Sequence, residues 1–403
     1  MLGRTLLLNS AAATSYWFST GATSLSFPSS TIAVDAAGNI YTGYSKRNAD
    51  GSVAWQNNLT SAYGVAVDSG GNSYTIIAAG GYTQLIKLSP TGSFLWARQL
   101  AASDTTAVNP LCVTVDSSDN VYVSGYRNTS GARLTYLVKF NSSGTAQWHR
   151  QFGSTTSFYS INAISVDSSG NVHVCGGWSI TTSTYRPVVT KLDSTGALLW
   201  TRVVWSNNSS SQQCQAVEVS STGDVYAVFN GVVSGAFSIS TVVKLTSAGV
   251  PSLYRAWQNG TSANADGYAL AVSPDGNTVY VGGAAPNNTT ILVSMTSAGA
   301  LNFARQITSS PNTTAILYKI LASSTYLTLG FSGDAISRIP ADGSLTKTTG
   351  PYTYSVATGV STATLSQTNT TTTVSMVTTT TLNITTVTPT IGSNSNTYPV
   401  YPL

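Results

Sequence analysis

Histidine and carboxylate side chains carry most acid–base chemistry and much of the metal binding in proteins, and this sequence has few of them. Two histidines, His149 and His173, and 14 Asp and Glu residues stand among 403 positions. The histidines occupy places in a repeated pattern where other copies carry Ala97 and Tyr122. We therefore interpret both histidines as incidental to any catalysis.

Four aspartates recur at one place in the repeat and raise the question of calcium, which prefers clustered oxygen ligands. Later copies carry serine there, at Ser220 and Ser273. A turn cap tolerates that exchange, and the intervals place the aspartates in different structural units. The sequence favours turn capping, with calcium binding as the alternative, for Asp35, Asp68, Asp116 and Asp167.

No other motif points to catalysis. The chain has no Gly-x-Ser-x-Gly nucleophile turn and no Gly-x-x-x-x-Gly-Lys phosphate loop. Its three cysteines, Cys112, Cys175 and Cys214, match neither a disulfide framework nor a Cys-x-x-Cys metal pair. The sequence predicts a protein that is not an enzyme and has no metal and no cofactor.

A Trp-x-Arg pattern recurs, as in Trp96/Arg98, Trp148/Arg150 and Trp200/Arg202. Residues two apart on a strand share one face. Each pair is therefore either a sugar-stacking site or a packing contact between neighbouring repeats. Because the pattern returns in successive units, we favour packing.

Two segments that differ between repeats combine aromatic, hydroxyl and Arg side chains, a mixture that suits contact with a glycan or a protein. We predict that they are loops on one face of the fold, with ordinary exposed loops as the alternative. The candidate ligand-binding or partner-binding residues in them are Tyr126, Arg127, Trp178, Tyr185 and Arg186.

The elements that position these residues come from an internal repeat. The hairpin pattern at 164–173, Ile-Ser-Val-Asp-Ser-Ser-Gly-Asn-Val-His, returns with its turn Asp or Ser at intervals of 33, 48, 51, 53 and 53 residues. A second hairpin, such as the one near 189–202, follows in each unit. Four-stranded units of this length, repeated six or more times, predict a β-propeller. The apolar spacing of a helical solenoid is missing.

We predict an all-β fold in which residues 1–350 form a β-propeller of seven or eight four-stranded blades. The N-terminal hairpin at 5–18 looks like the second half of a unit, so we expect it to share the closing blade with a hairpin from around 352–367. N-terminal and C-terminal strands then close the ring. Seven first hairpins against eight second-hairpin positions leave the blade number open.

Residues 351–403 form an uncharged Thr- and Asn-rich segment, because no Asp, Glu, Lys, Arg or His follows Lys347. Its β-branched residues favour extended strands, and a disordered linker is the alternative. We expect part of the segment to close the ring and the rest to be an extended anchor that pairs with a neighbouring chain.

Charge and hydropathy exclude several classes of protein. Only 8% of residues are charged and the net charge is +4, so we expect no nucleic-acid partner. No apolar stretch is long enough for a membrane span, and the run 6–8 is too short for a signal-peptide core. We therefore expect no membrane span and no cleaved signal.

The patterns from Val166 (Val-Asp-Ser-Ser-Gly-Asn-Val) and from Val189 (Val-Thr-Lys-Leu-Asp-Ser-Thr-Gly) resemble bacterial and bacteriophage β-propeller repeats, relatives of the NHL-type propellers. The resemblance covers residues 5 to about 350. The low charge and the Thr/Asn-rich end also look like tail-fibre or appendage proteins of marine tailed phages.

The resemblance implies a non-catalytic structural and binding protein of a phage particle, located in the virion and used for host attachment. Its expected partners are other virion proteins, through the C-terminal segment, and a host-surface glycan or protein, in a homo- or hetero-oligomeric assembly. The alternative is a bacterial secreted or cell-surface binding module. An enzyme on a propeller would need paired carboxylates or a His/Tyr/Arg set at one end of the axis.

Overall fold

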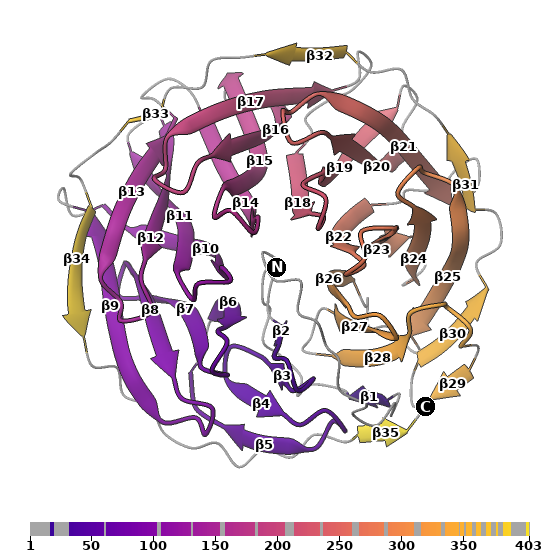
Figure 1. The fold of residues 1–403 in the computed structure, drawn as a ribbon, viewed down its shortest axis with the longest axis horizontal. Coiled ribbons are helices and arrows are strands. Elements are labelled where there is room, and N and C mark those ends of the chain that lie inside the picture. The colour runs from indigo at the N-terminus through magenta and orange to yellow at the C-terminus, as the bar shows by residue number, and fades with distance from the viewer. Residues whose placement is uncertain are drawn as a thin grey trace.

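Seven antiparallel sheets stand around a central axis in the computed structural model, and no helix occurs in the part of the chain that it describes (Figure 1). The blade number is therefore seven. The described residues are 17–19, 32–59, 62–102, 106–129, 132–153, 158–181, 184–205, 213–233, 237–259, 266–285, 289–309, 316–331, 335–345, 347–349, 352–356, 360–363, 368–371, 376–377, 382–387 and 400–402.

Each blade is two consecutive hairpins, with the first strand nearest the axis and the fourth farthest from it. β-branched and aromatic residues fill the strands, and a Gly at positive φ closes most turns, such as Gly170 (φ 78°) and Gly196 (φ 80°). Blades 1 to 3 contain β2 Ala33–Val34, β3 Ile40–Tyr41, β4 Ser45–Arg47 and β5 Val53–Gln56; β6 Ala62–Val67, β7 Ser73–Ala79, β8 Tyr82–Leu88 and β9 Phe94–Ala102; and β10 Val108–Val115, β11 Val121–Thr129, β12 Ala132–Phe140 and β13 Ala146–Phe152.

The later blades have the same order and similar strand lengths. Blades 4 to 6 contain β14 Phe158–Val166, β15 Val172–Thr181, β16 Thr184–Leu192 and β17 Leu198–Trp205; β18 Gln213–Val219, β19 Val225–Val233, β20 Phe237–Leu245 and β21 Pro251–Asn259; and β22 Asp266–Val272, β23 Thr278–Ala285, β24 Thr289–Thr296 and β25 Leu301–Ser309.

Blade 7 closes the ring by joining the two ends of the chain. It contains β26 Leu317–Ala322, β27 Tyr326–Phe331 and β28 Ile336–Pro340, and β1 Trp17–Ser19 pairs with β28 as its fourth strand. β35 Val400–Pro402 then pairs with the other edge of β1. Ring closure by N-terminal and C-terminal strands is therefore confirmed, although residues 5–16 of the expected hairpin lie outside the described residues.

The origin of the closing strands differs from the expectation. The missing hairpin was expected from residues 352–367, but β26 and β27 supply it, and the strands at 352–356 and 360–363 pair with other blades. The alternative of eight blades is wrong, because these two strands join existing blades and form no eighth sheet. The last of the eight second-hairpin positions in the sequence, at Lys347, belongs to β29 Lys347–Thr349, which pairs with β30 Tyr352–Val356 on the outside of blade 6.

The C-terminal segment forms a belt of single strands around the outside of the ring, drawn in gold and yellow in Figure 1. It visits the blades in reverse order, pairing with the fourth strands of blades 6, 5, 4, 3 and 2 and finally with β1. The belt strands are β30, β31 Val360–Ala363, β32 Thr368–Thr371, β33 Met376–Val377, β34 Leu382–Val387 and β35. The segment expected to extend to a neighbour thus pairs, in its described parts, with its own ring.

The hydrophobic core lies between blades rather than within them. One cluster joins Leu85 and Leu100 of blade 2 to Val121 and Phe140 of blade 3, and corresponding clusters fill the other blade interfaces. Each sheet therefore buries both faces against its neighbours. The inner strands are held at fixed places around the axis as a result.

Candidate functional site

The Trp-x-Arg pairs connect each outer strand to the next blade. The Arg150 Nε donates to the carbonyl of Gly196 at 2.8 Å, and its Nη2 donates to the carbonyl of Thr195 at 2.8 Å. The guanidinium also lies over the Trp148 ring, 5.4 Å from its centroid. The same bond to a turn glycine or its neighbour recurs from Arg98, Arg202, Arg255 and Arg305.

Arg338 makes the equivalent connection across the closure of the ring, from blade 7 to the carbonyls of Gly38 (2.6 Å) and Ala49 (2.7 Å) in blade 1. Between blades 1 and 2 the indole of Trp55 donates to the Pro90 carbonyl at 3.0 Å. The interpretation of these pairs as packing between blades is confirmed. We therefore propose no sugar-stacking role for the Trp-x-Arg pairs.

Replacing Arg150 by alanine removes three hydrogen bonds from a charged donor, two of them to the next blade and one to the carbonyl of His149. We expect the free energy of unfolding to fall by about 2 kcal/mol, because a bond to a charged group contributes about 1.5–3 kcal/mol. Guanidinium chloride denaturation measures this change. Arg150→Lys is the matched control, since an ammonium keeps the charge but cannot bridge two carbonyls as the fork does, and it should recover only part of the loss. Equal stability of Arg150→Ala and the wild type would contradict the prediction.

The recurrent aspartates cap their turns. The Asp116 Oδ1 accepts the backbone N–H groups of Ser118 and Asn120 at 2.9 Å, and its Oδ2 accepts the Tyr122 hydroxyl at 2.9 Å. Asp35 and Asp68 make the same set of bonds, and Lys87 adds an ion pair to Asp68 at 3.2 Å. The turn-capping prediction is confirmed. No group of three His, Cys, Asp or Glu side chains converges on a metal position within the described ranges.

His173 takes the place that tyrosine has in blades 1 to 3. It is completely buried, packs against Trp200 with ring centroids 6.1 Å apart, and has no hydrogen bond to either ring nitrogen from the described residues. Burial, with Lys191 adding to it, lowers the pKa of His173 to about 3. His149 is half-buried, and burial followed by the charge of Arg150 lowers its pKa. Both imidazoles are therefore neutral at physiological pH and away from the central channel.

His173 makes the stability of the ring depend on pH. The His173 imidazole binds a proton near pH 6.5 in the unfolded chain but only near pH 3 in the folded chain. The free energy of unfolding therefore falls as the pH drops below 6.5. In His173→Tyr the phenol replaces the imidazole and donates to Asp167, as Tyr122 does to Asp116. We expect the variant to gain about 2 kcal/mol at pH 5 relative to pH 8, since each pKa unit is worth about 1.4 kcal/mol.

Denaturation curves at pH 5 and pH 8 measure this difference. Tyr122→His is the matched variant. It places a second imidazole at the equivalent position of blade 3, so its stability should fall more steeply below pH 6.5 than that of the wild type. A parallel pH profile for His173→Tyr and the wild type would show that the imidazole takes up its proton in the folded state.

The five predicted binding residues lie on strands rather than in loops. Tyr126 and Arg127 are near the end of β11, Trp178 is in β15, and Tyr185 and Arg186 are in β16. Arg127 is buried, and the other four are half-buried. The Arg133 guanidinium lies 4.0 Å from the Tyr126 ring centroid, and Trp178 packs against the core between blades 3 and 4. The structure groups them by blade and does not gather all five into one site.

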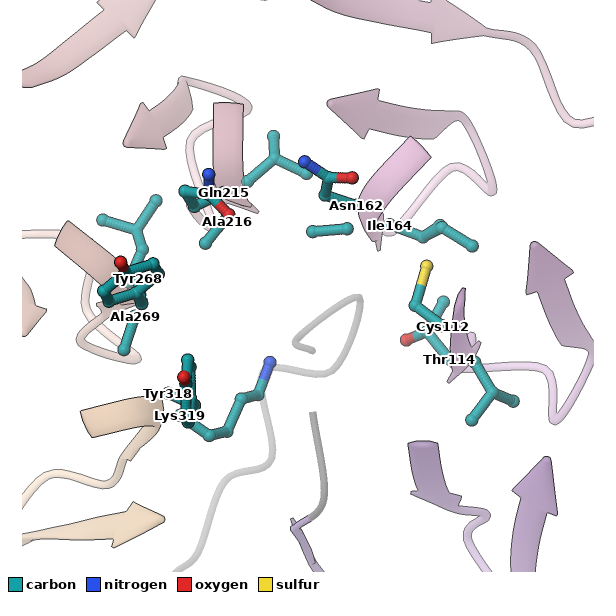
Figure 2. Close-up of a pocket in the computed structure, with 14 residues that line it drawn as sticks. Cys112, Thr114, Asn162, Ile164, Gln215, Ala216, Tyr268, Ala269, Tyr318 and Lys319 are labelled. Atoms are coloured by element: carbon teal, nitrogen blue, oxygen red, sulfur yellow. The ribbon is translucent and has the colours of Figure 1, made fainter. Parts of the chain in front are cut away.

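A better candidate site lies on the axis, where five blades line a cavity with their first strands (Figure 2). Each of these strands changes register against its partner, so that one residue is extra and unpaired. Such β-bulges re-aim side chains and are frequent next to functional sites. With blade 2 included, the extra residues are Tyr63, Leu111, Asn162, Gln215, Tyr268 and Tyr318.

The lining of this cavity is polar but nearly uncharged. Figure 2 shows Asn162 and Gln215 on the first strands of neighbouring blades, Tyr268 and Tyr318 next along the ring, and Lys319 extending toward the middle. Asn162 Nδ2 donates to the Cys214 carbonyl at 2.8 Å and contacts Gln213 Oε1 at 3.3 Å. Cys112 lies on the remaining side, where burial raises the pKa of its thiol to about 11. The cavity therefore holds hydrogen-bonding amides and hydroxyls, two aromatic rings and one amine.

The sequence analysis missed this site, although a signal for it exists. The bulge residue stands five positions before the turn Asp or Ser of its repeat, as Asn162 does before Asp167 and Tyr268 before Ser273. At that position the copies carry Tyr, Leu, Asn, Gln, Tyr and Tyr, while the flanking positions stay small or apolar, except for Lys319 in blade 7. Variation at one repeat position on the innermost strand is the mark that could have identified it.

Comparison with known proteins supports a β-propeller repeat in this chain. A family model described as beta-propeller repeat matches residues 147–176, which run from β13 into β15. No curated protein matches the chain. The described ranges contain no helix that is long and apolar enough to span a membrane.

Several solved structures are similar to this chain over most of its length. A catalytically inactive virginiamycin B lyase from Staphylococcus aureus, crystallised with quinupristin, has a TM-score of 0.52 at 11% identity, over 81% of this chain and 99% of that one. BamB from Moraxella catarrhalis has a TM-score of 0.43 at 16% identity, over 79% and 99% of the two chains. The periplasmic gluconolactonase of Pseudomonas aeruginosa has a TM-score of 0.48 at 13% identity, over 90% of this chain and 99% of that one. At these identities the likeness concerns the fold alone.

Proposed function

We propose that this seven-bladed β-propeller repeat protein is a non-catalytic structural and binding protein of a phage particle, a tail fibre or surface appendage that holds the particle to its host. The belt is the observation that carries the proposal. It adds a fifth strand to blades 2 to 6 and to the closing blade. The ring is therefore held together by its closing blade, by the contacts between blades and by the belt around its outside. A ring held by three sets of contacts is rigid, which suits a protein that displays a binding surface better than an enzyme that must move during its reaction.

The belt also supports the choice of partner surface. Its strands are the outermost strands of most blades, so a neighbouring virion protein that approaches the periphery meets the belt strands first. Exposed apolar side chains stand near the starts of the fourth strands, among them Phe94, Leu95, Leu199 and Leu301, each 36–52% exposed. Exposed apolar side chains and unpaired strand edges favour association with other chains. The expected assembly is therefore built through the outer rim.

The channel lining supports a binding role over a catalytic one. Among the residues that line the cavity, the acid–base candidates are one lysine, two tyrosines and a cysteine, with no carboxylate pair. Burial raises the pKa of Tyr268 to about 12 and also raises that of Tyr318, so neither phenol is a base at neutral pH. An enzyme of polysaccharide cleavage would need a different set.

Peptide mass spectrometry of density-purified particles tests the proposal, with copy number measured against the major capsid protein. We expect tens of copies per particle or fewer. Absence from particles, with the protein found in a bacterial envelope or medium, would overturn the virion location and favour the bacterial binding module. Cleavage of a host polysaccharide by the purified protein would overturn the non-catalytic role.

A further inference from the structure

We infer that the central channel is a binding site for a carboxylated sugar unit, held between the paired tyrosines, the two amides and the Lys319 ammonium. The inference deepens the proposed binding role and rests on it for the source of the ligand, a host-surface glycan. The residues come from the first strands of blades 4 to 7, which the blade interfaces hold in place.

The chemistry of the bulge positions is not required by the fold. Blade 3 has Leu111 at the equivalent bulge, so an apolar side chain also satisfies this position. Blades 4 and 5 nevertheless place Asn162 and Gln215 there, and blades 6 and 7 place Tyr268 and Tyr318. Four polar or amphipathic side chains in a row on one arc of the channel need an explanation outside packing.

The tyrosines form an apolar wall with polar ends. Their rings meet edge to face, with centroids 5.3 Å apart and an interplanar angle of 60°. Burial, with the charge of Asp266 adding to it, raises the pKa of the Tyr268 hydroxyl. Both phenols are thus neutral, and the pair gives the cavity wall aromatic surface, on which the C–H face of a pyranose can pack.

The amides complement sugar hydroxyls. The Gln215 amide forms no hydrogen bond with any residue that the structure describes, and it lies half-buried on the cavity wall. Asn162 uses its Nδ2 for the Cys214 carbonyl and Gln213, which leaves its Oδ1 as an acceptor. Together they offer a donor and two acceptors beside the tyrosine wall.

Lys319 selects the charge of the ligand. Its ammonium forms no ion pair within the described ranges, and it extends toward the channel centre. Burial lowers the pKa of Lys319, and the attraction of Glu218 does not restore it. An anionic group in the channel would stabilise the charged amine and form a charge-assisted hydrogen bond. A carboxylate on the sugar is the group that fits a site otherwise built for hydroxyls.

Isothermal titration of the full chain with tri-galacturonate, and with galactotriose as the uncharged comparison, tests the inference. We expect the wild type to bind tri-galacturonate at least tenfold more tightly than galactotriose. Lys319→Met should lose that preference and keep the galactotriose affinity, since one charge-assisted bond is worth about a factor of ten or more. Lys139→Met, on β12 away from the channel, should bind like the wild type.

A second variant keeps the inference testable if Lys319→Met fails to fold. Gln215→Glu places a negative charge on the cavity wall and should weaken tri-galacturonate binding more than galactotriose binding, which loses only the Gln215 amide donor. The inference is overturned if the wild type binds neither trisaccharide, or if both variants keep the uronate preference. Particle composition is measured separately, so failure of channel binding and failure of the virion role are distinguishable.

Discussion

A chain that ends at residue 350 is expected to lose at least about 5 kcal/mol of stability and to associate in solution. The truncation removes β30 to β35, which pair through backbone hydrogen bonds with the fourth strands of blades 2 to 6 and with β1. Each such bond contributes about 1 kcal/mol. The exposed outer edges then offer unpaired N–H and C=O groups to other chains. Denaturation midpoints and gel filtration measure both effects.

A chain that ends at residue 397 is the matched control. It removes only β35 from the closing blade and keeps the other belt strands. We expect an intermediate loss of stability, with a monomeric protein. If the chain ending at 350 unfolds at the same denaturant concentration as the full chain and stays monomeric, the belt does not stabilise the ring.

Gly283→Ala is expected to be the most damaging single substitution near the channel. Gly283 faces the bulge of β22, where a Cβ would lie 1.6 Å from the Asp266 carbonyl oxygen. Because the obstacle is backbone, the bulge itself must rearrange, and Tyr268 must leave its place in the cavity wall. We expect a loss of more than about 3 kcal/mol, in the range of severe packing defects. Thermal unfolding and near-ultraviolet circular dichroism of the tyrosines measure it.

Gly70→Ala is the control for Gly283→Ala. Its Cβ would meet only side-chain atoms of Asn72 and Asp68, at 3.2 and 3.5 Å, so its stability should change by about 0.5 kcal/mol or less. Wild-type stability of Gly283→Ala would mean that the bulge adjusts without cost and does not fix the cavity wall.

The blades were predictable because each one is encoded locally. Alternating apolar residues around Asp-x-x-Gly turns define the hairpins, and the turn bonds of Asp116 connect residues no more than six positions apart. The Trp-x-Arg connections were predictable from recurrence, since a contact such as Arg150 to Gly196 repeats with the period of the blades.

The belt and the channel were harder to predict for a physical reason. A segment such as Thr368–Thr371 fits any exposed strand edge equally well, so its partner depends on where the preceding strands bring the chain. The binding role of the five candidate residues stays a prediction, since aromatic and Arg side chains near strand ends, such as Trp178, also pack between blades. The bulges depend on register, which becomes visible only when the repeat copies are compared position by position.

The reverse path of the belt has a consequence for biosynthesis. Chains fold from the N-terminus as they are made, yet Trp17–Ser19 pairs with Ile336–Pro340 on one side and with Val400–Pro402 on the other. The strand at Trp17–Ser19 can therefore pair only after the six blades that follow it in the sequence have been made. During translation the growing arc of blades keeps two open ends and bare outer edges. Protection of this intermediate, by a chaperone or by rapid synthesis, is expected to limit the yield of folded protein more than the stability of the finished ring does.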